Sequence, residues 1–127
     1  MINKELINPK SIVVVGGSND KLKAGGSTLE HILTGTFRGD LYVVNAKEDM
    51  VQGVKSYRSV EDIPNADLAV ISIPAKACKP VMETLITQKG VKAFIIFSAG
   101  FSEESPEGVQ MEKEIARLCA DNGVTLI

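Results

Sequence analysis

The residues SIVVVGGSNDKLKAGG, positions 11–26, give the first indication of the fold of this chain. It begins with a β-branched run that is apolar on both faces, which is typical of a strand buried inside a parallel sheet. Two glycine pairs follow, Gly16-Gly17 and Gly25-Gly26, and a helical pattern begins beyond them. A buried strand, a glycine-rich turn and a helix together indicate a sheet whose strands are joined by helical crossovers.

Apolar runs of the same kind recur along the chain, and residues at helical spacing separate most of them. Each run has four to six residues and is predicted to be a buried strand: Ile12–Val15, Leu41–Val44, Leu68–Ile73, Ala93–Phe97 and Val124–Ile127. The helical patterns are Leu29, Ile32, Leu33 and Phe37, then Cys78, Val81, Met82, Leu85 and Ile86, then Met111, Ile115, Leu118 and Cys119. We therefore predict a doubly wound α/β fold, with a parallel sheet and helices on both faces.

Local signals define several element ends. Ser105-Pro106 supplies an N-cap and a first-turn proline for the last helix, and Asn122-Gly123 supplies its stop. Ser59 is expected to cap a single helical turn, and Val54–Tyr57 is expected to be a short edge strand. The last predicted strand runs to Ile127, so we expect a piece of a longer chain.

Composition bounds the function. The chain has 127 residues, of which 14 are basic and 16 acidic, giving a net charge of −2. This length predicts one domain over residues 1–127. The charge argues against nucleic acid, or an anionic membrane, as a partner held by bulk charge. No apolar run approaches the roughly 20 residues of a membrane span, and the first residues lack the apolar segment of a signal peptide.

The cysteines and the histidine do not form a metal-binding pattern. Cys78 and Cys119 stand far apart in the sequence, and His31 is the only histidine. A structural zinc site needs four ligands, so no metal is expected in this domain. The two thiols are expected to be reduced and packed against helices, as in a cytoplasmic protein.

The glycine-rich turn after the first strand is a candidate phosphate-binding loop. Ligands of doubly wound sheets bind beyond the carboxyl ends of the strands, where glycines let the backbone approach them closely. The helix that follows offers free N–H groups and a partial positive charge. Eight residues separate Gly17 from Gly26, which is too many for the GxGxxG pattern. An ordinary structural turn is the alternative. In the binding interpretation, a side chain at Gly16 would occupy the space of the pyrophosphate or force φ into a costly region.

The second predicted strand ends in Val44-Asn45-Ala46-Lys47, with no acidic residue at its tip. NAD-binding domains place a carboxylate there for the ribose hydroxyls, whereas a lysine suits an additional phosphate on the adenosine ribose. NADP carries such a phosphate at the 2′ position and coenzyme A at the 3′ position. A solvated surface lysine is the alternative interpretation.

The residues after the remaining strands shape the predicted site but are not typical catalytic groups. Ile73-Pro74 follows one strand and forms a rigid lip, and the small residues Ser98-Ala99-Gly100 follow the next. The residues form no constellation typical of catalysis. His31 is off the apolar stripe of its helix, and neither cysteine follows a strand.

These motifs in combination resemble the N-terminal CoA-binding domain of the NDP-forming acyl-CoA synthetases, whose wider relative is the α-subunit of succinyl-CoA synthetase. The resemblance extends from Asn8 to Ile127. It rests on the motifs Ser11–Ser18, Gly25-Gly26, Phe37-Arg38-Gly39, Tyr42–Lys47, Asp67–Ile71, Ile73-Pro74-Ala75, Gly90–Ala93 and Phe97–Phe101.

The resemblance implies a Rossmann-like domain that holds coenzyme A (CoA) or acyl-CoA. It places the phosphates at the glycine loop, the adenosine and its 3′-phosphate at the second strand, and the pantetheine arm along the later strand ends. The implied binding residues, in that order, are Gly16, Gly17, Ser18, Asn19, Lys23, Gly25 and Gly26; Asn45 and Lys47; Ile73 and Pro74 flanking the nucleotide; and Phe97, Ser98, Ala99 and Gly100. The chain departs from the family at Ala46, where proline is usual, and at Leu22, where glycine is usual.

The resemblance also implies that CoA binding and catalysis belong to different domains. The full enzyme would convert acyl-CoA, NDP and phosphate to a carboxylic acid, CoA and NTP through a phosphohistidine that lies in a following domain. This chain is expected to bind CoA without turnover, with the remaining synthetase domains or subunit as its partners. Two alternatives stay open: a stand-alone, non-enzymatic CoA-binding module, and an NADP-binding oxidoreductase domain, which the long glycine loop disfavours.

Overall fold

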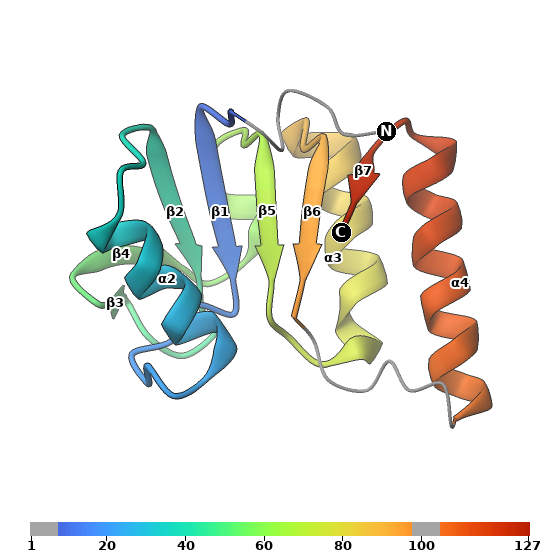
Figure 1. Ribbon diagram of the computed structural model, residues 1–127, viewed down its shortest axis with the longest axis horizontal. Coiled ribbons are helices and arrows are strands. Elements are labelled where there is room, and N and C mark those ends of the chain that lie inside the picture. The colour runs from blue at the N-terminus through green and yellow to red at the C-terminus, as the bar shows by residue number, and fades with distance from the viewer. Residues whose placement is uncertain (1–7, 98–104) are drawn as a thin grey trace.

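The computed structural model describes residues 8–97 and 105–127, and these form one twisted sheet with helices on both faces (Figure 1). Within these residues the sheet has seven strands in the order β3-β4-β2-β1-β5-β6-β7. Their bounds are β1 Ser11–Val15, β2 Asp40–Val44, β3 Met50–Val51, β4 Val54–Tyr57, β5 Leu68–Ile71, β6 Ala93–Ile96 and β7 Thr125–Leu126. All neighbours are parallel except β3, which pairs antiparallel with β4 at the edge. The doubly wound prediction is confirmed.

The register of the parallel strands brings their carboxyl ends level. Val15 at the end of β1 pairs with Val44 of β2 on one side and with Ile71 of β5 on the other. Val44 in turn pairs with Tyr57, and Ile71 with Ile96. The chain leaves β1 toward β2 and β4, and returns to the other side of β1 as β5. The boundary between β1 and β5 is therefore the switch point at which such sheets bind ligands.

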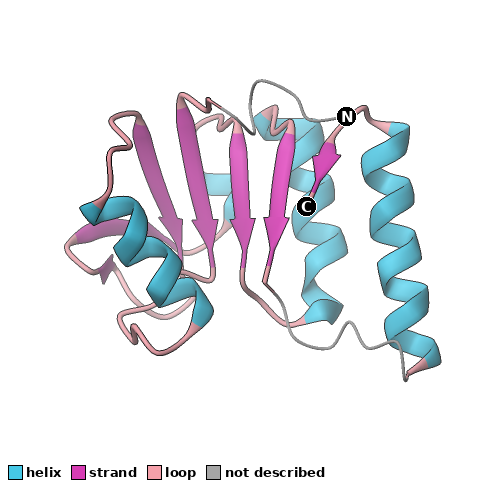
Figure 2. Cartoon of the chain, viewed as in Figure 1, coloured by secondary structure: helices cyan, strands magenta, loops and turns pink. Residues whose placement is uncertain are grey.

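Helices cover the two faces unequally. Helix α2 (Ala24–Thr34) lies over β1 and β2 on one face, whereas α3 (Ala75–Lys89), α4 (Pro106–Asp121) and the 3-10 turn η1 (Val60–Asp62) pack on the other (Figures 1 and 2). Successive residues of β1 alternate between the two cores: Ile12 and Val14 contact the α2 side, and Val13 and Val15 the α3 side. This explains why the strand is apolar on both faces.

Most predicted boundaries are confirmed, and the differences are local. Ser105 caps α4 by accepting a hydrogen bond from Gly108 N, and Ser59 caps η1. Helix α2 ends at Thr34, so Phe37 lies beyond the helix on which its spacing placed it. Phe37 packs against the core on the α2 side from the following loop. The spacing therefore predicted too long a helix, because Phe37 joins the same core from a loop.

The strands β5 and β6 end at Ile71 and Ile96, one or two residues before the predicted ends. The two-residue strand β3 was not predicted, because so short a strand has no pattern of its own. Cys78 and Cys119 are buried thiols on α3 and α4. Burial raises the pKa of the Cys119 thiol to about 11, so this thiol is protonated at neutral pH. In the part of the chain that the structure describes, no helix is both long and apolar enough to cross a bilayer.

The two leucines of α2 test the layer arrangement. Leu29 is 0% exposed and Leu33 is 42% exposed, although the helical pattern included both. We expect Leu29→Ala to lower the free energy of unfolding by about 2–5 kcal/mol, because it leaves a cavity between α2 and the sheet. Leu33→Ala, the matched control, should lower it by less than about 1 kcal/mol. Urea denaturation measures both, and equal losses would contradict the packing of α2.

Candidate functional site

The loops after the parallel strands are held together at one edge by backbone hydrogen bonds. Gly16 N donates to Val44 O at 2.9 Å, and Ser72 N donates to Val15 O at 2.8 Å. Each bond extends the pairing by one residue beyond a strand end. The glycine loop, the Asn45–Lys47 turn and the β5–α3 turn therefore start from neighbouring points of one rigid edge.

An open cavity of about 730 Å³ lies at this edge. It is bounded by the ends of β1 and β2, the N-cap of α2, the start of η1 and the β5–α3 turn. Its lining residues are Val15, Gly16, Lys23, Val44, Asn45, Ala46, Lys47, Arg58, Ser59, Val60, Glu61, Ile73, Pro74 and Val81. Its floor is apolar, and charged side chains line its rim.

The glycines of the loop are required by contacts within the protein. Gly16 has a φ of +88°, and a Cβ atom there would lie 2.1 Å from Ser72 O at the end of β5. A Cβ atom at Gly25 would lie 2.2 Å from Gly16 O. The φ of +88° confirms the expectation that a side chain at Gly16 would force a costly backbone conformation. A side chain there meets the backbone of the neighbouring strand end first.

Two amide side chains clamp the glycine loop to the β3–β4 turn. Gln52 Nε2 donates to Ser18 O at 2.8 Å and to Gly26 O at 2.9 Å, so it spans both ends of the loop. Asn19 Oδ1 accepts from Gln52 N at 2.7 Å, and Asn19 Nδ2 donates to Met50 O at 3.3 Å. Gln52 has a φ of 48°, which is uncommon for a residue with a side chain. The sequence contains no signal for Gln52, because its partners are 26 and 34 residues away.

Asn45 joins the glycine loop to the lysine turn. Its Nδ2 donates to Gly17 O at 2.9 Å, while its Oδ1 accepts from Lys47 N at 2.8 Å and from Glu48 N at 3.0 Å. The two bonds to Oδ1 form an Asx turn, which sets the direction of the chain at Lys47. The side-chain amide of Asn45 is thus engaged with protein groups, and it fixes the glycine loop and the lysine turn relative to each other.

Arg58 is a cation of this site that the sequence analysis missed. It follows Tyr57 at the end of β4, lines the cavity and stands beside the lysine turn. Its Nη1 donates to Ala46 O at 2.9 Å, and its Nε and Nη2 donate to Asp49 Oδ1 at 3.1 and 2.7 Å. The rule that residues just after a strand face the site would have found Arg58, had it been applied to the edge strand Val54–Tyr57 as well.

The electrostatics of the rim are local. Lys23, Lys47 and Arg58 line the cavity together with one carboxylate, that of Glu61. Lys23 occupies the N-cap of α2, where its ammonium group cannot accept hydrogen bonds from the first helical N–H groups. The first N–H groups of the helix and the helix dipole favour an anion at this point. A chain with a net charge of −2 therefore presents a cationic rim at the strand ends.

The structure brings together most of the residues implied by the resemblance. Those that line the cavity are Gly16, Lys23, Asn45, Lys47, Ile73 and Pro74. Those that build the loop without lining the cavity are Gly17, Ser18, Asn19, Gly25 and Gly26. Phe97 is exposed just beyond β6, and its N–H donates to Ile71 O. Ser98, Ala99 and Gly100 lie outside the described residues.

The two departures from the family lie at this edge. Leu22 is 97% exposed at the tip of the glycine loop, where its N–H donates to Asp20 Oδ1 at 3.0 Å. Ala46 lines the cavity, and its carbonyl accepts from Arg58. The loop thus accommodates a leucine by pointing it away from the protein, and the alanine retains the turn.

Comparison with known proteins identifies relatives for this arrangement. Residues 10–127 match the family model described as a CoA binding domain. The α-subunit of ADP-forming acetate–CoA ligase II from Pyrococcus furiosus is 42% identical over 123 residues, which are 94% of this chain and 26% of that protein. A solved dinucleotide-forming acetyl-coenzyme A synthetase from Ca. Korarchaeum cryptofilum superposes with a TM-score of 0.84 and 34% identity, covering 98% of this chain and 27% of that one.

The relatives differ in length. The chain spans about a quarter of the acetate–CoA ligase subunit and of the solved synthetase. A conserved hypothetical protein from Pyrococcus furiosus is similar to this chain over 90% of its own length, with a TM-score of 0.71 and 26% identity. The same fold thus occurs within long synthetases and in a short chain.

The family match covers nearly the whole chain and includes the cavity, the glycine loop and the lysine turn. The chain therefore belongs to the CoA-binding domain family and aligns with the N-terminal region of the α-subunits of ADP-forming acyl-CoA synthetases.

Proposed function

We propose that this chain binds CoA or acyl-CoA at the carboxyl ends of β1 and β2. The observation that carries the proposal is the cavity between the glycine loop and the lysine turn, with a cationic rim on an apolar floor. The pyrophosphate and the 3′-phosphate of CoA suit the cationic rim. Its adenosine and its largely uncharged pantetheine arm suit the apolar surface.

The pyrophosphate is placed at the start of α2. Lys23 lines the cavity there, and the helix that it precedes has no side-chain cap, so the two can supply charge and hydrogen-bond donors. Gln52 and Asn19 hold the loop in one conformation before the ligand arrives. A loop ordered in advance loses less conformational entropy when it binds its ligand.

The adenosine is placed between the lysine turn and the β5–α3 turn. Ile73 and Pro74 form an apolar wall there, and Lys47 stands at the rim. A dianionic phosphate on the ribose would then lie near Lys47. The pantetheine arm would leave toward the ends of β5 and β6, where Phe97 is exposed.

For the whole protein we propose an ADP-forming acyl-CoA synthetase, in which this domain holds CoA while other domains or a partner subunit carry out the chemistry. The length of the relatives supports this, because the chain covers only about a quarter of the acetate–CoA ligase subunit. A stand-alone CoA-binding module is the second candidate, supported by the short relative of matching length.

Lys47 provides the test of the ligand's orientation. We expect calorimetry to detect CoA binding, and Lys47→Ala to weaken it about ten-fold or more, because a charge-assisted hydrogen bond contributes roughly 1.5–3 kcal/mol. Binding of dephospho-CoA, which lacks the 3′-phosphate, should change less than about two-fold.

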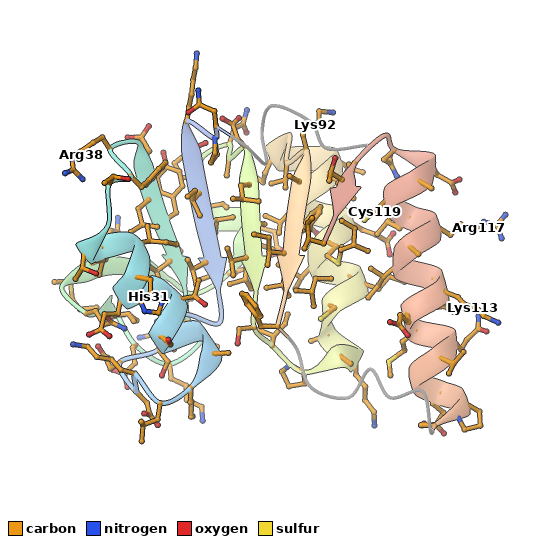
Figure 3. The ribbon with its side chains drawn as sticks, in the orientation of Figure 1. His31, Arg38, Lys92, Lys113, Arg117 and Cys119 are labelled. Atoms are coloured by element: carbon orange, nitrogen blue, oxygen red, sulfur yellow. The ribbon has the colours of Figure 1, made fainter. Side chains whose placement is uncertain are left out.

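The control for Lys47 is Lys92→Ala. Lys92 precedes β6 at the amino ends of the parallel strands, away from the cavity (Figure 3). This variant should therefore bind CoA as the wild type does. Equal losses for CoA and dephospho-CoA in Lys47→Ala would reject the placement of the 3′-phosphate. Binding of NADP in preference to CoA would reject the proposed ligand.

Gln52 provides the test of the clamped loop. Gln52→Gly tolerates the φ of 48°, removes the side-chain hydrogen bonds and keeps the backbone N–H that donates to Asn19 Oδ1. We expect the Kd for CoA and for dephospho-CoA to rise by the same factor, about five-fold or more, because both ligands carry the pyrophosphate. Gln88→Ala, on the exposed surface of α3, is the control and should leave both affinities unchanged. A selective loss of CoA binding alone in Gln52→Gly would contradict the role of this clamp.

A further inference from the structure

We propose that Arg58 is a second cation for the 3′-phosphate of CoA and that it determines, together with Lys47, the preference for a 3′-phosphorylated ligand. The inference rests on the proposed function and adds a specificity-determining residue to it. Arg58 lies outside the glycine loop and the lysine turn that pointed to the site.

The sheet places Arg58 next to the lysine turn. Val44 and Tyr57 are paired in the register of β2 and β4, and Asn45 N donates to Tyr57 O at 2.9 Å. Asn45 and Arg58 are therefore the first residues beyond two adjacent strand ends. Lys47 follows two residues after Asn45, and all three residues line the same cavity.

Hydrogen bonds hold the guanidinium group in place. Its contacts with described residues are the bonds to Ala46 O and to Asp49 Oδ1. A guanidinium group has five N–H donors, of which these three bonds use three. The other two remain for an anion in the cavity. Since Ala46 and Asp49 flank Lys47 in the same turn, the bonds that orient Arg58 also keep it beside Lys47.

The carboxylates near Arg58 do not cancel its charge in the cavity. Asp49 forms the ion pair with Arg58 at 2.7 Å, but its side chain is 86% exposed and that of Arg58 is 52% exposed. Water screens such a pair, so Asp49 orients the guanidinium group more than it neutralises it. Glu61 also lines the cavity, and its carboxylate accepts a hydrogen bond from Ser59 Oγ. Glu48 lies in the lysine turn and is exposed.

A ribose phosphate is the ligand group that this pair of cations suits. A phosphate monoester carries about −1.5 to −2 charge at neutral pH, so one lysine leaves part of its charge unmatched. The planar guanidinium group offers two donors to a phosphate at once, whereas an ammonium group acts as a point charge. Dephospho-CoA lacks this group and gives neither cation a partner at this position.

The test compares CoA with dephospho-CoA by calorimetry for the chain and its variants. We expect Arg58→Ala to weaken CoA binding about ten-fold and dephospho-CoA binding less than about two-fold. Arg58→Lys keeps the charge but loses the fork, and should fall between wild type and Arg58→Ala. The matched control is Arg38→Ala, which should behave as wild type. Arg38 is exposed and precedes β2 at the amino ends of the parallel strands (Figure 3).

Asp49→Asn separates direct contact from support of the turn. If Arg58 contacts the phosphate, this variant should retain the CoA preference within about two-fold, because asparagine keeps the Oδ1 acceptor that orients the guanidinium group. Loss of the preference in Asp49→Asn to the same extent as in Arg58→Ala would overturn the proposal, as would equal losses for both ligands in Arg58→Ala. If the wild type failed to bind CoA, the proposed function itself would be rejected. Wild-type binding with an unchanged preference in Arg58→Ala would reject only the role of Arg58.

Discussion

The parallel pairing of β1 with both β2 and β5 is the constraint on which the site depends. Val15 is bonded into two neighbouring ladders, and the pairing continues into the loops through Gly16 N and Ser72 N. The three segments that border the cavity consequently start from fixed points on one rigid edge. The backbone leaves no space for a Cβ atom at Gly16, because the carbonyl oxygen of Ser72, just beyond β5, lies there.

Side-chain amides carry this rigidity from the sheet into the loops. Asn45 links the glycine loop to the lysine turn, and Gln52 links the same loop to the β3–β4 turn. The polar residues near the cavity therefore divide into two groups. Amides bond to the protein and hold its shape, whereas Lys23, Lys47 and Arg58 present positive charge to the cavity. A ligand with several phosphates gains most from cations that are already held in position.

The fold was largely predictable because both faces of the sheet are buried. Runs such as Ile12–Val15 must be apolar at every position, and that pattern is easy to recognise. The errors arose where local pattern and tertiary contact differ. Phe37 continued a helical spacing while packing from a loop, and β3 was too short to show alternation. The glycine loop and Lys47 were found because a strand end is a position that the sequence alone can locate.

The sequence alone was enough to predict the main strands, the helices, the glycine loop and a lysine at the second strand end. These features follow from hydrophobic periodicity, from glycine and from capping residues, which act over a few positions of the chain. Three features became visible only in the folded chain: Gln52 clamps a loop more than 20 residues away, the backbone at Ser72 requires a glycine at position 16, and Arg58 joins Lys47 at one cavity. These contacts depend on strand order and register, which bring together residues distant in sequence, and no local pattern encodes that proximity.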